Sequence, residues 1–296
     1  MAAEKDARIV IPESDKRVED AKTKLFDYNI TPASLEEFFN KIEFYIEYIS
    51  QLKFTDGWTT EMLKKYLQDP IHLGSTIVAC NDADGMVAGA VTPTSEVIRT
   101  AIRTVGIKDS SQWVSSIFFM ISPDGENAYT FSDCGVIPDP DSDQLVEIAY
   151  EASQLHQLIS GEEPRVAFLS FSTLGSAKHY RVVRVQDAVH KFGKKYPHIK
   201  HEGELQFDAA IIPEIAKNKI PKSVLNGKAN ILIFPNLDAG NIAYKITERF
   251  GGYLALGPLL QGLKKPIHDL SRGCSVKDII TVSAITAMQK VEYANI

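Results

Sequence analysis

The chain of 296 residues has only three cysteines, Cys80, Cys134 and Cys274, and no Cys-x-x-Cys pair. An odd number of widely spaced cysteines argues against a disulfide framework and against a zinc site, so we expect a cytoplasmic location. No apolar run approaches the roughly 18 residues that cross a membrane, and the first ten residues lack the apolar segment of a secretory signal. These absences predict a cytoplasmic protein without membrane contact or a bound metal.

Positive charge is missing from one part of the chain. Residues 122–163 hold ten acidic residues and no Lys or Arg, whereas residues 178–228 hold eleven Lys or Arg and five acidic residues. The whole chain has 32 basic and 38 acidic residues, a net charge of −6, which argues against a general nucleic-acid binder. Such blocks are usually solvated surface, although the basic block could also attract a phosphorylated ligand.

What the chain does contain is an alternation of strand-like and helical patterns. The apolar, strand-like runs lie at 7–10, 76–80 (TIVAC), 115–121, 165–172 and 230–235. Helical patterns lie at 16–26, 34–52, 142–159, 178–196, 240–250 and 275–290. Strands that alternate with helices predict an α/β fold with mainly parallel sheets.

Three polar loops in this pattern lead into predicted helices. They are SFSTLGSAKH (170–179), FPNLDAGNIAYK (234–245) and PIHDLSRGCSVKDII (266–280). Free backbone N–H groups and the helix dipole favour an anion at a helix start, and loops after parallel strands carry the working groups of α/β folds. Any one of these loops could be an ordinary connection, and the three together leave ordinary connections and a phosphate-rich ligand as two open interpretations.

The third loop contains more than a helix cap requires. Ser275 and Asp278 predict a capping box at the start of the last helix. That box does not explain Ser271 and Arg272, which precede it. An arginine can bind phosphate through two parallel hydrogen bonds, and a serine can add a hydroxyl donor. On these residues alone a structural cap is the favoured interpretation, and an anion site that uses Ser271 and Arg272 is the alternative.

These stretches resemble the phosphate acetyltransferase (phosphotransacetylase) family from about Gly57 to Gln289. The similar segments are DADGMVAGAV, DCGVIPDPDSDQLVEIA, FLSFSTLGSAKH, EGELQFDAAIIPE, FPNLDAGNIAYK and ALGPLLQGLKKPIHDLSRGCSVKDII. The resemblance implies reversible acetyl transfer, in which acetyl-CoA and phosphate give CoA and acetyl phosphate. It also implies a homodimer, and no cofactor apart from CoA as substrate.

The resemblance further implies two three-layer α/β domains with mainly parallel sheets around a cleft, as in isocitrate and isopropylmalate dehydrogenases. The first domain is expected to comprise residues 1–108 and 261–296. The second is expected to comprise residues 109–260. The stretch between the first predicted helix and Ser34 is short for the family, so the first domain is expected to be a shortened one.

The resemblance also implies the roles of single residues. Asp278 matches the proposed base, while Arg272 and Ser271 match groups that bind phosphate or the acyl oxygen. The implied substrate-binding residues are Arg99, Thr94, Arg17, Ser172, Thr173, Asn241, Lys245 and Cys274. An ordinary aspartate titrates more than ~4 pH units below a thiol, so proton loss from CoA is expected to be concerted with attack. Transfer would then be direct, in a ternary complex.

Several residues depart from the family pattern. Thr92 and Pro93 replace a histidine and a hydroxyl residue, and Pro93 also lacks an N–H. Lys53 and His268 stand where an arginine and an asparagine are usual. One alternative is therefore a phosphate butyryltransferase-like enzyme, and another is a non-catalytic acetyl-CoA-sensing domain of the kind fused to some malic enzymes. An acetyl-cysteine on Cys274 is a further alternative, although the sequence pairs no histidine with it.

Overall fold

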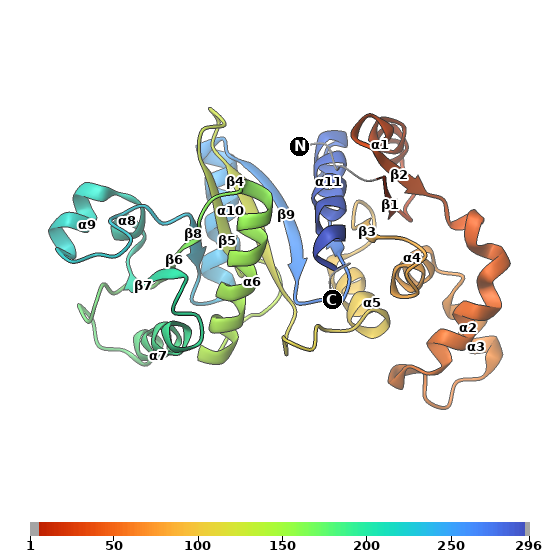
Figure 1. The fold of residues 1–296 in the computed structure, drawn as a ribbon, viewed down its shortest axis with the longest axis horizontal. Helices are drawn as coiled ribbons and strands as arrows, with labels where there is room; N and C mark the ends of the chain where they lie inside the picture. Colours follow the sequence, from red (N-terminus) through yellow and green to blue (C-terminus); the bar gives the residue numbers. More distant parts are fainter. Residues whose placement is uncertain (1–5, 294–296) are drawn as a thin grey trace. The chain divides into compact units, whose positions relative to one another are not determined.

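The computed structural model describes residues 6–293, which Figure 1 draws as a ribbon. Contacts divide the chain into unit 1, Met1–Gln112 with Gly257–Ile296, and unit 2, Trp113–Leu256. The predicted domain boundaries lie a few residues from this division. Each unit is built around its own sheet, and the strand β9 begins in unit 2 and ends in unit 1.

Unit 1 contains a four-stranded sheet in the order β10-β3-β1-β2, with every pair parallel. Its strands are β1 (Ala7–Val10), β2 (Ile30–Ala33), β3 (Gly85–Ala88) and β10 (Ile267–Asp269). Its helices are α1 (Lys16–Leu25), η1 (Phe26–Tyr28), η2 (Leu35–Lys41), α2 (Ile42–Ser50), η3 (Lys53–Thr55), α3 (Thr60–Tyr66), α4 (Pro70–Ala79), α5 (Thr94–Thr104) and α11 (Val276–Tyr293).

Helices cover both faces of this sheet. Consecutive residues of a strand point to opposite faces, and on β3 these are Gly85 and Met86. A Cβ on Gly85 would lie 2.4 Å from Thr286 of α11, whereas the sulfur of Met86 approaches Gly74 of α4. The helices α11 and α4 therefore pack on opposite faces, and Gly85 allows the close approach of α11.

The segment TIVAC, residues 76–80, is not the strand that its apolar character predicts. It forms the end of α4 and its C-cap. Asp69 caps this helix by accepting from the N–H of Ile71 at 2.8 Å, and Pro70 occupies the first turn. A short apolar run cannot be distinguished from a buried helix segment by periodicity alone, and here tertiary burial of Thr76, Ile77 and Val78 accounts for the composition.

The predicted helix at 34–52 is present in two pieces. A 3₁₀ helix, η2, precedes α2, and η3 follows. Ser34 donates its N–H to Glu37 Oε1 at 3.0 Å, so a capping box formed by Ser34 and Glu37 fixes the start of η2. Tyr45, Ile46 and Ile49 of α2 are buried and form the face of this helix that packs against the protein.

Unit 2 contains a six-stranded sheet in the order β7-β6-β8-β5-β4-β9. The pairs from β7 to β5 are parallel, and β4 pairs antiparallel with β5. The strands are β4 (Ser115–Ile121), β5 (Ala128–Ser132), β6 (Arg165–Leu169), β7 (Lys200–Leu205), β8 (Ile231–Ile233) and β9 (Leu254–Gln261). The helices are α6 (Ser142–Ser160), α7 (Tyr180–Lys195), α8 (Phe207–Ile211), α9 (Pro213–Lys219) and α10 (Leu237–Gly251).

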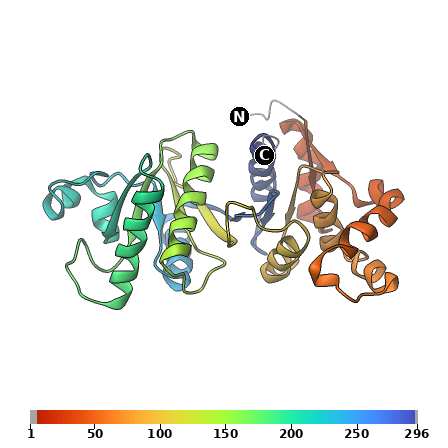
Figure 2. The same ribbon diagram turned by 60° about the horizontal axis from the view of Figure 1, so that its bottom comes forward.

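Helices also cover both faces of the unit 2 sheet, as Figure 2 shows from a second side. Phe118 of β4 stacks on Tyr244 of α10 with ring centroids 3.8 Å apart. The ring of the next residue, Phe119, has its centroid 5.8 Å from that of the His156 ring of α6. Because neighbouring strand residues point to opposite faces, α10 and α6 cover opposite sides.

The predicted helices at 142–159, 178–196, 240–250 and 275–290 correspond to α6, α7, α10 and α11. The α/β class with mainly parallel pairing is thus confirmed. None of the helices within residues 6–293 has the length and apolarity that crossing a membrane requires.

Candidate active site

Three loops of unit 1 leave the carboxyl ends of neighbouring parallel strands. They follow β1, β3 and β10, which are adjacent in the sheet. Because the carboxyl ends of parallel strands meet at one edge, the loops at 11–15, 89–93 and 270–275 lie together. The residues that the sequence predicted in unit 1 are on these loops or on the first turns of the helices after them.

Arg17 ties the three loops together. Its Nη1 donates to the carbonyls of Arg272 and Cys274, each at 2.9 Å, and its Nη2 donates to the Ala90 carbonyl at 3.1 Å. Nε and Nη2 also donate to Asp15 Oδ2. A guanidinium has five N–H donors, so all five are engaged by protein acceptors. Arg17 therefore organises these loops and has no N–H left for a ligand in this conformation.

The Glu13 carboxylate accepts hydrogen bonds from the backbone N–H groups of the loop after β3. It accepts from the N–H groups of Ala90 at 2.8 Å, Val91 at 3.0 Å and Thr92 at 2.6 Å. Successive backbone N–H groups of this kind can bind an anion. Here the anion is a side chain of the protein, so this loop offers no free N–H at residues 90–92 to a phosphate.

The loop after β10 carries the most accessible cationic group. Ser271 and Arg272 are exposed, and the Ser271 hydroxyl accepts from the N–H of Gly273 at 3.3 Å. Within residues 6–293, no protein acceptor lies within hydrogen-bond reach of the Arg272 guanidinium. Unlike Arg17, Arg272 therefore has its planar set of donors available to an anion.

The capping box predicted at the start of α11 is present. The N–H of Ser275 donates to Asp278 Oδ2 at 2.8 Å, and the N–H of Asp278 donates to Ser275 Oγ at 3.2 Å. The Ser275 hydroxyl also donates to Asp278 Oδ2 at 2.9 Å. The carboxylate is half-buried, and the box fixes its position in the first turn of α11. A capping role and a role in proton transfer are thus compatible.

The first turns of α5 hold Thr94 and Arg99. The Thr94 hydroxyl donates to Asp269 Oδ2 at 2.5 Å. Arg99 is 54% exposed and pairs with Glu96 at 3.0 Å, and Glu96 in turn contacts His72 at 3.2 Å. Only one Arg99 nitrogen is used by this pair, so the guanidinium keeps donors for a ligand.

Cys274 lies beside this cluster but is buried. Burial raises the pKa of its thiol above the ordinary value, although the nearby Arg17 opposes that rise. A thiol of raised pKa is a poor nucleophile at neutral pH. The geometry thus favours Cys274 as a packed residue behind the loop.

The loop after β6 in unit 2 contains Ser172 and Thr173. Ser172 is fully buried, and its hydroxyl donates to Glu204 Oε1 at 2.7 Å. The same Glu204 oxygen accepts from the N–H of Gly175 at 2.7 Å. Burial opposes ionisation of Glu204, yet the hydrogen bonds from Gly175 and Ser172 outweigh it and lower the pKa. Ser172 is therefore part of the loop's internal structure.

This loop does not present the free backbone donors expected of an anion-binding loop. Each N–H from residue 172 to residue 177 has a protein acceptor. Those acceptors are Ser170 Oγ, Ser176 Oγ, Glu204 O, Glu204 Oε1, Thr173 O and Ser172 Oγ. Residues 172–177 therefore offer no free backbone N–H to an anion, because the loop closes on itself and on Glu204; an anion at the start of the helix that follows residues 170–179 stays a prediction.

Asn241 and Lys245 lie one turn apart on α10. Asn241 donates its side-chain N–H to the Cys134 carbonyl at 3.0 Å, and its Oδ1 accepts from Lys245 Nζ. The Lys245 ammonium also lies 4.7 Å from the centre of the Tyr244 ring. The hydrogen bond to Cys134 anchors Asn241 to the loop after β5, and Lys245 is exposed.

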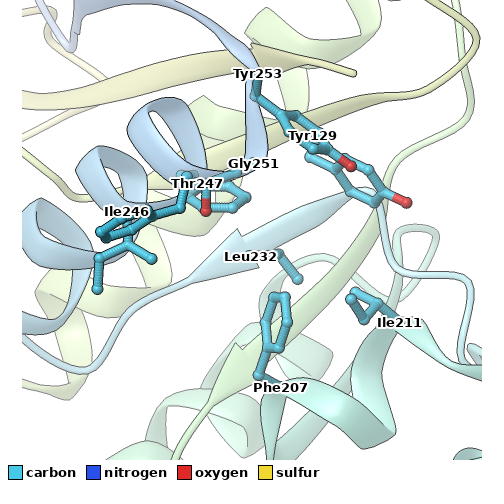
Figure 3. Close-up of a pocket in the computed structure, with 10 residues that line it drawn as sticks. Tyr129, Phe207, Ile211, Leu232, Ile246, Thr247, Gly251 and Tyr253 are labelled. Atoms are coloured by element: carbon cyan, nitrogen blue, oxygen red, sulfur yellow. The ribbon is translucent and has the colours of Figure 1, made fainter. Parts of the chain in front are cut away.

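Unit 2 also has an apolar pocket of about 420 Å³. Its lining residues are Tyr129, Phe131, Phe207, Ile211, Leu232, Ile246, Thr247, Phe250, Gly251 and Tyr253. Figure 3 shows Phe207 and Ile211 of α8 facing the pocket from one side, and Ile246 of α10 from another. None of the residues predicted from the sequence lines this pocket.

The sequence did not single out three buried carboxylates that shape these loops: Glu13, Glu204 and Asp269. Glu13 follows the predicted strand at 7–10, Glu204 lies in the quoted segment EGELQFDAAIIPE, and Asp269 lies in the quoted segment PIHDLSRGCSVKDII. For Glu13 the available signal was an acidic residue shortly after an apolar strand. The strands β7 (KHEGEL) and β10 (IHD) are polar and carried no such signal for Glu204 and Asp269. Residues 6–293 contain no group of three or more His, Cys, Asp or Glu placed to hold a metal ion.

Known proteins resemble this chain over almost its whole length. The family model described as phosphate acetyl/butaryl transferase matches residues 7–287. A phosphate acetyltransferase of Acetivibrio thermocellus is 42% identical over 289 residues, which cover 96% of this chain and 86% of that protein.

Solved structures agree with this match. A phosphotransacetylase from Streptococcus pyogenes has a TM-score of 0.91 at 35% identity and covers 98% of this chain and 96% of its own. The EutD phosphotransacetylase from Staphylococcus aureus has a TM-score of 0.84 at 37% identity, over 96% and 94% of the two chains. This chain therefore belongs to the phosphate acetyl/butaryl transferase family.

Proposed function

We propose that the protein is a phosphate acetyltransferase, an acyltransferase that moves an acetyl group reversibly between CoA and phosphate. The relatives at 42–45% identity carry that name. The observation that carries the proposal is the contrast between two arginines: Arg17 is fully engaged by the protein, whereas Arg272 is exposed with its donors available. A phosphate bound by Arg272 lies next to the Asp278 carboxylate.

Arg272 and Arg99 bind the phosphate group, and the Thr94 hydroxyl becomes a third donor when its hydrogen is released from Asp269 Oδ2. Ser271 donates to a phosphate oxygen or to the acyl oxygen, where negative charge develops during transfer. Arg17, Ser172 and Thr173 hold the loops in shape rather than binding substrate. For Arg17, Ser172 and Thr173, this assignment follows from side-chain donors that are already engaged within the protein.

Asp278 accepts the proton of the CoA thiol. In the direction of acetyl-CoA synthesis, the sulfur attacks the carbonyl carbon of acetyl phosphate while its proton passes to Asp278. The C–O bond to phosphate then breaks, and phosphate leaves toward Arg272. Because the thiol is the weaker acid by more than ~4 pH units relative to an ordinary aspartate, proton loss and attack are concerted. No covalent enzyme intermediate forms, and Cys274 serves as a packed residue.

Asn241 and Lys245 contact CoA, Lys245 through its ammonium group. The substrates are acetyl-CoA, phosphate and acetyl phosphate, with no cofactor besides them, so activity should survive treatment with a chelator. We further propose a cytoplasmic homodimer. The arrangement of the two units around a cleft, with a shortened first domain, stays a prediction from the family resemblance.

The test is a coupled assay of the purified protein with acetyl-CoA and phosphate, beside butyryl-CoA and phosphate. We expect phosphate-dependent release of CoA, faster with acetyl-CoA. Faster release from butyryl-CoA would favour the phosphate butyryltransferase alternative. Tight binding of acetyl-CoA without turnover in either direction would leave an acetyl-CoA-sensing domain.

A further inference from the structure

A buried carboxyl stands behind one of the proposed phosphate ligands. Asp269 is the last residue of β10, and Thr94 is the first residue of α5. The bond between Thr94 Oγ1 and Asp269 Oδ2 measures 2.5 Å. It joins the helix that carries Arg99 to the strand that leads to Arg272, so it lies at the centre of the proposed phosphate site.

The surroundings of Asp269 disfavour its ionised form. The residue is 0% exposed, and its Oδ1 is buried without a hydrogen-bond partner among residues 6–293. Gly89 lies against it: a Cβ there would come within 2.2 Å of Oδ1, so only glycine leaves room for the carboxyl. Removal from water penalises a carboxylate that accepts few hydrogen bonds. Burial accordingly raises the pKa of Asp269 to about 7, with Glu13 adding to the rise and Thr94 opposing it.

The protonation state of Asp269 decides the direction of its bond to Thr94. An ionised carboxylate can only accept, so the single O–H of Thr94 must point at Asp269. Phosphate oxygens need donors, and in that state Thr94 has none to give. A protonated Asp269 can instead donate to Thr94 Oγ1, with its proton taken from solvent, and the Thr94 O–H then turns to the ligand.

We propose that Asp269 is a positioning residue that decides whether the Thr94 hydroxyl can donate a hydrogen bond to the bound phosphate. The inference rests on the proposed function, because it takes Thr94 to be a phosphate ligand. It predicts tighter anion binding when Asp269 is protonated and weaker binding when Asp269 is ionised.

Other charged groups surround this position on each packed element. The loop after β1 provides Glu13, which binds the N–H groups at 90–92, and α1 provides Arg17, which bonds Ala90 O. On α5, Glu96 and Arg99 form an ion pair. The helix α11 provides Asp278, whose carboxylate accepts a hydrogen bond from the Ser275 hydroxyl.

Two histidines also lie near the site. His268 precedes Asp269 on β10, and its ring bonds Leu260 N–H and Gln289 instead. His72 contacts Glu96 of the ion pair on α5. All these groups remain in a variant that changes only Asp269, so that variant isolates its contribution.

The experiment measures sulfate binding by calorimetry between pH 5.5 and pH 8.5. Sulfate serves as the probe because, unlike phosphate, it does not change charge in this range. For the wild type we expect affinity to fall about tenfold or more as pH rises, the equivalent of one hydrogen bond to an anion. The fall should centre near the pKa of Asp269.

Two variants carry the test. Asp269→Asn is always neutral and can donate to Thr94, so sulfate affinity should stay at the wild-type low-pH value throughout the range. Thr94→Val lacks the hydroxyl, so affinity should match the wild-type high-pH value throughout. Ser95→Ala removes the exposed neighbouring hydroxyl and serves as the matched control, with the wild-type pH dependence retained.

If the sulfate affinity of Thr94→Val depends on pH as that of the wild type does, the inference is overturned. This variant does not change a fully buried side chain. The same conclusion would follow from an unchanged dependence in folded Asp269→Asn. Turnover with acetyl-CoA is measured separately. If the wild type shows no turnover while Asp269→Asn abolishes the pH dependence of sulfate binding, the proposed function fails and this inference stands.

Discussion

At the scale of single residues, the site is described best by which polar groups already have partners. Arg17 and Arg272 are both arginines of the same loop cluster, yet within residues 6–293 the guanidinium of Arg17 makes five hydrogen bonds to protein oxygens and that of Arg272 makes none. Glu13 and Glu204 occupy backbone donors that a phosphate could otherwise use. The composition of a loop does not reveal this distinction.

The two arginines should therefore respond differently to substitution. Arg272→Ala should leave thermal stability unchanged and raise the KM for phosphate at least tenfold, because bidentate charged bonds to the ligand are lost. Arg17→Ala should lower the melting temperature by several degrees, because three backbone carbonyls and Asp15 lose a donor. Steady-state kinetics and thermal unfolding of both variants make the comparison. Equal loss of stability in the two would refute the assignment.

Asp278 should affect the rate more than the fold. Asp278→Asn can still accept from Ser275 through its carbonyl oxygen, so most of the cap is kept. Loss of a general base typically lowers kcat by ~10² or more, and we expect an effect of that size. Ser275→Ala is the control, since it removes part of the cap and leaves the carboxylate. A variant Asp278→Asn with near-normal kcat and a lower melting temperature would identify Asp278 as a cap alone.

At the scale of elements, His268 joins three segments of unit 1. Its Nδ1 accepts from the Leu260 N–H of β9 at 3.0 Å, and its Nε2 bonds Gln289 of α11 at 2.5 Å. Burial lowers the pKa of His268 from 6.5 to about 4. The neutral imidazole thus acts as a fixed donor and acceptor at the junction of β9, β10 and α11.

His268→Ala should cost about 2–4 kcal/mol of stability, because two buried hydrogen bonds are lost and their partners are left unpaired. The pH dependence follows from proton binding. The folded protein protonates His268 only near pH 4, whereas the unfolded chain does so near 6.5, so stability falls as pH drops through this window.

Urea denaturation at pH 7 and pH 5 provides the measurement. The decrease in the free energy of unfolding from pH 7 to pH 5 should be smaller in His268→Ala than in the wild type. The exposed His190 offers a control variant, His190→Ala, in which neither the free energy of unfolding at pH 7 nor its loss at pH 5 should change. A steep acid loss retained in His268→Ala would show that another group, such as the buried His156, is responsible.

At the scale of the whole molecule, the two units differ in how their chain segments are arranged. Unit 2 is continuous, whereas unit 1 receives β10 and α11 from the C-terminal segment. Residues 109–260 should therefore fold alone, because they keep the whole six-stranded sheet except the last residue of β9. Residues 1–108 alone should not fold, since they lack an edge strand and the helix α11 that covers one face.

Circular dichroism and thermal unfolding of the two fragments provide the measurement. We expect a cooperative transition for 109–260 and none for 1–108. Addition of a 257–296 peptide to 1–108 should restore a transition if the missing layer is the cause. A cooperative transition of 1–108 by itself would contradict the discontinuous unit.

The sequence by itself determined the α/β class, most helices and the family, because these depend on local periodicity, caps and motifs. Ser275 with Asp278 and Ser34 with Glu37 were predictable since capping is a local interaction. Tertiary structure decided that TIVAC is helical, because burial on both sides hides the periodicity of a short apolar run. It also decided which donors are free: Glu13, Asp269 and Glu204 reach their partners across strands far apart in sequence, and no local pattern records such contacts.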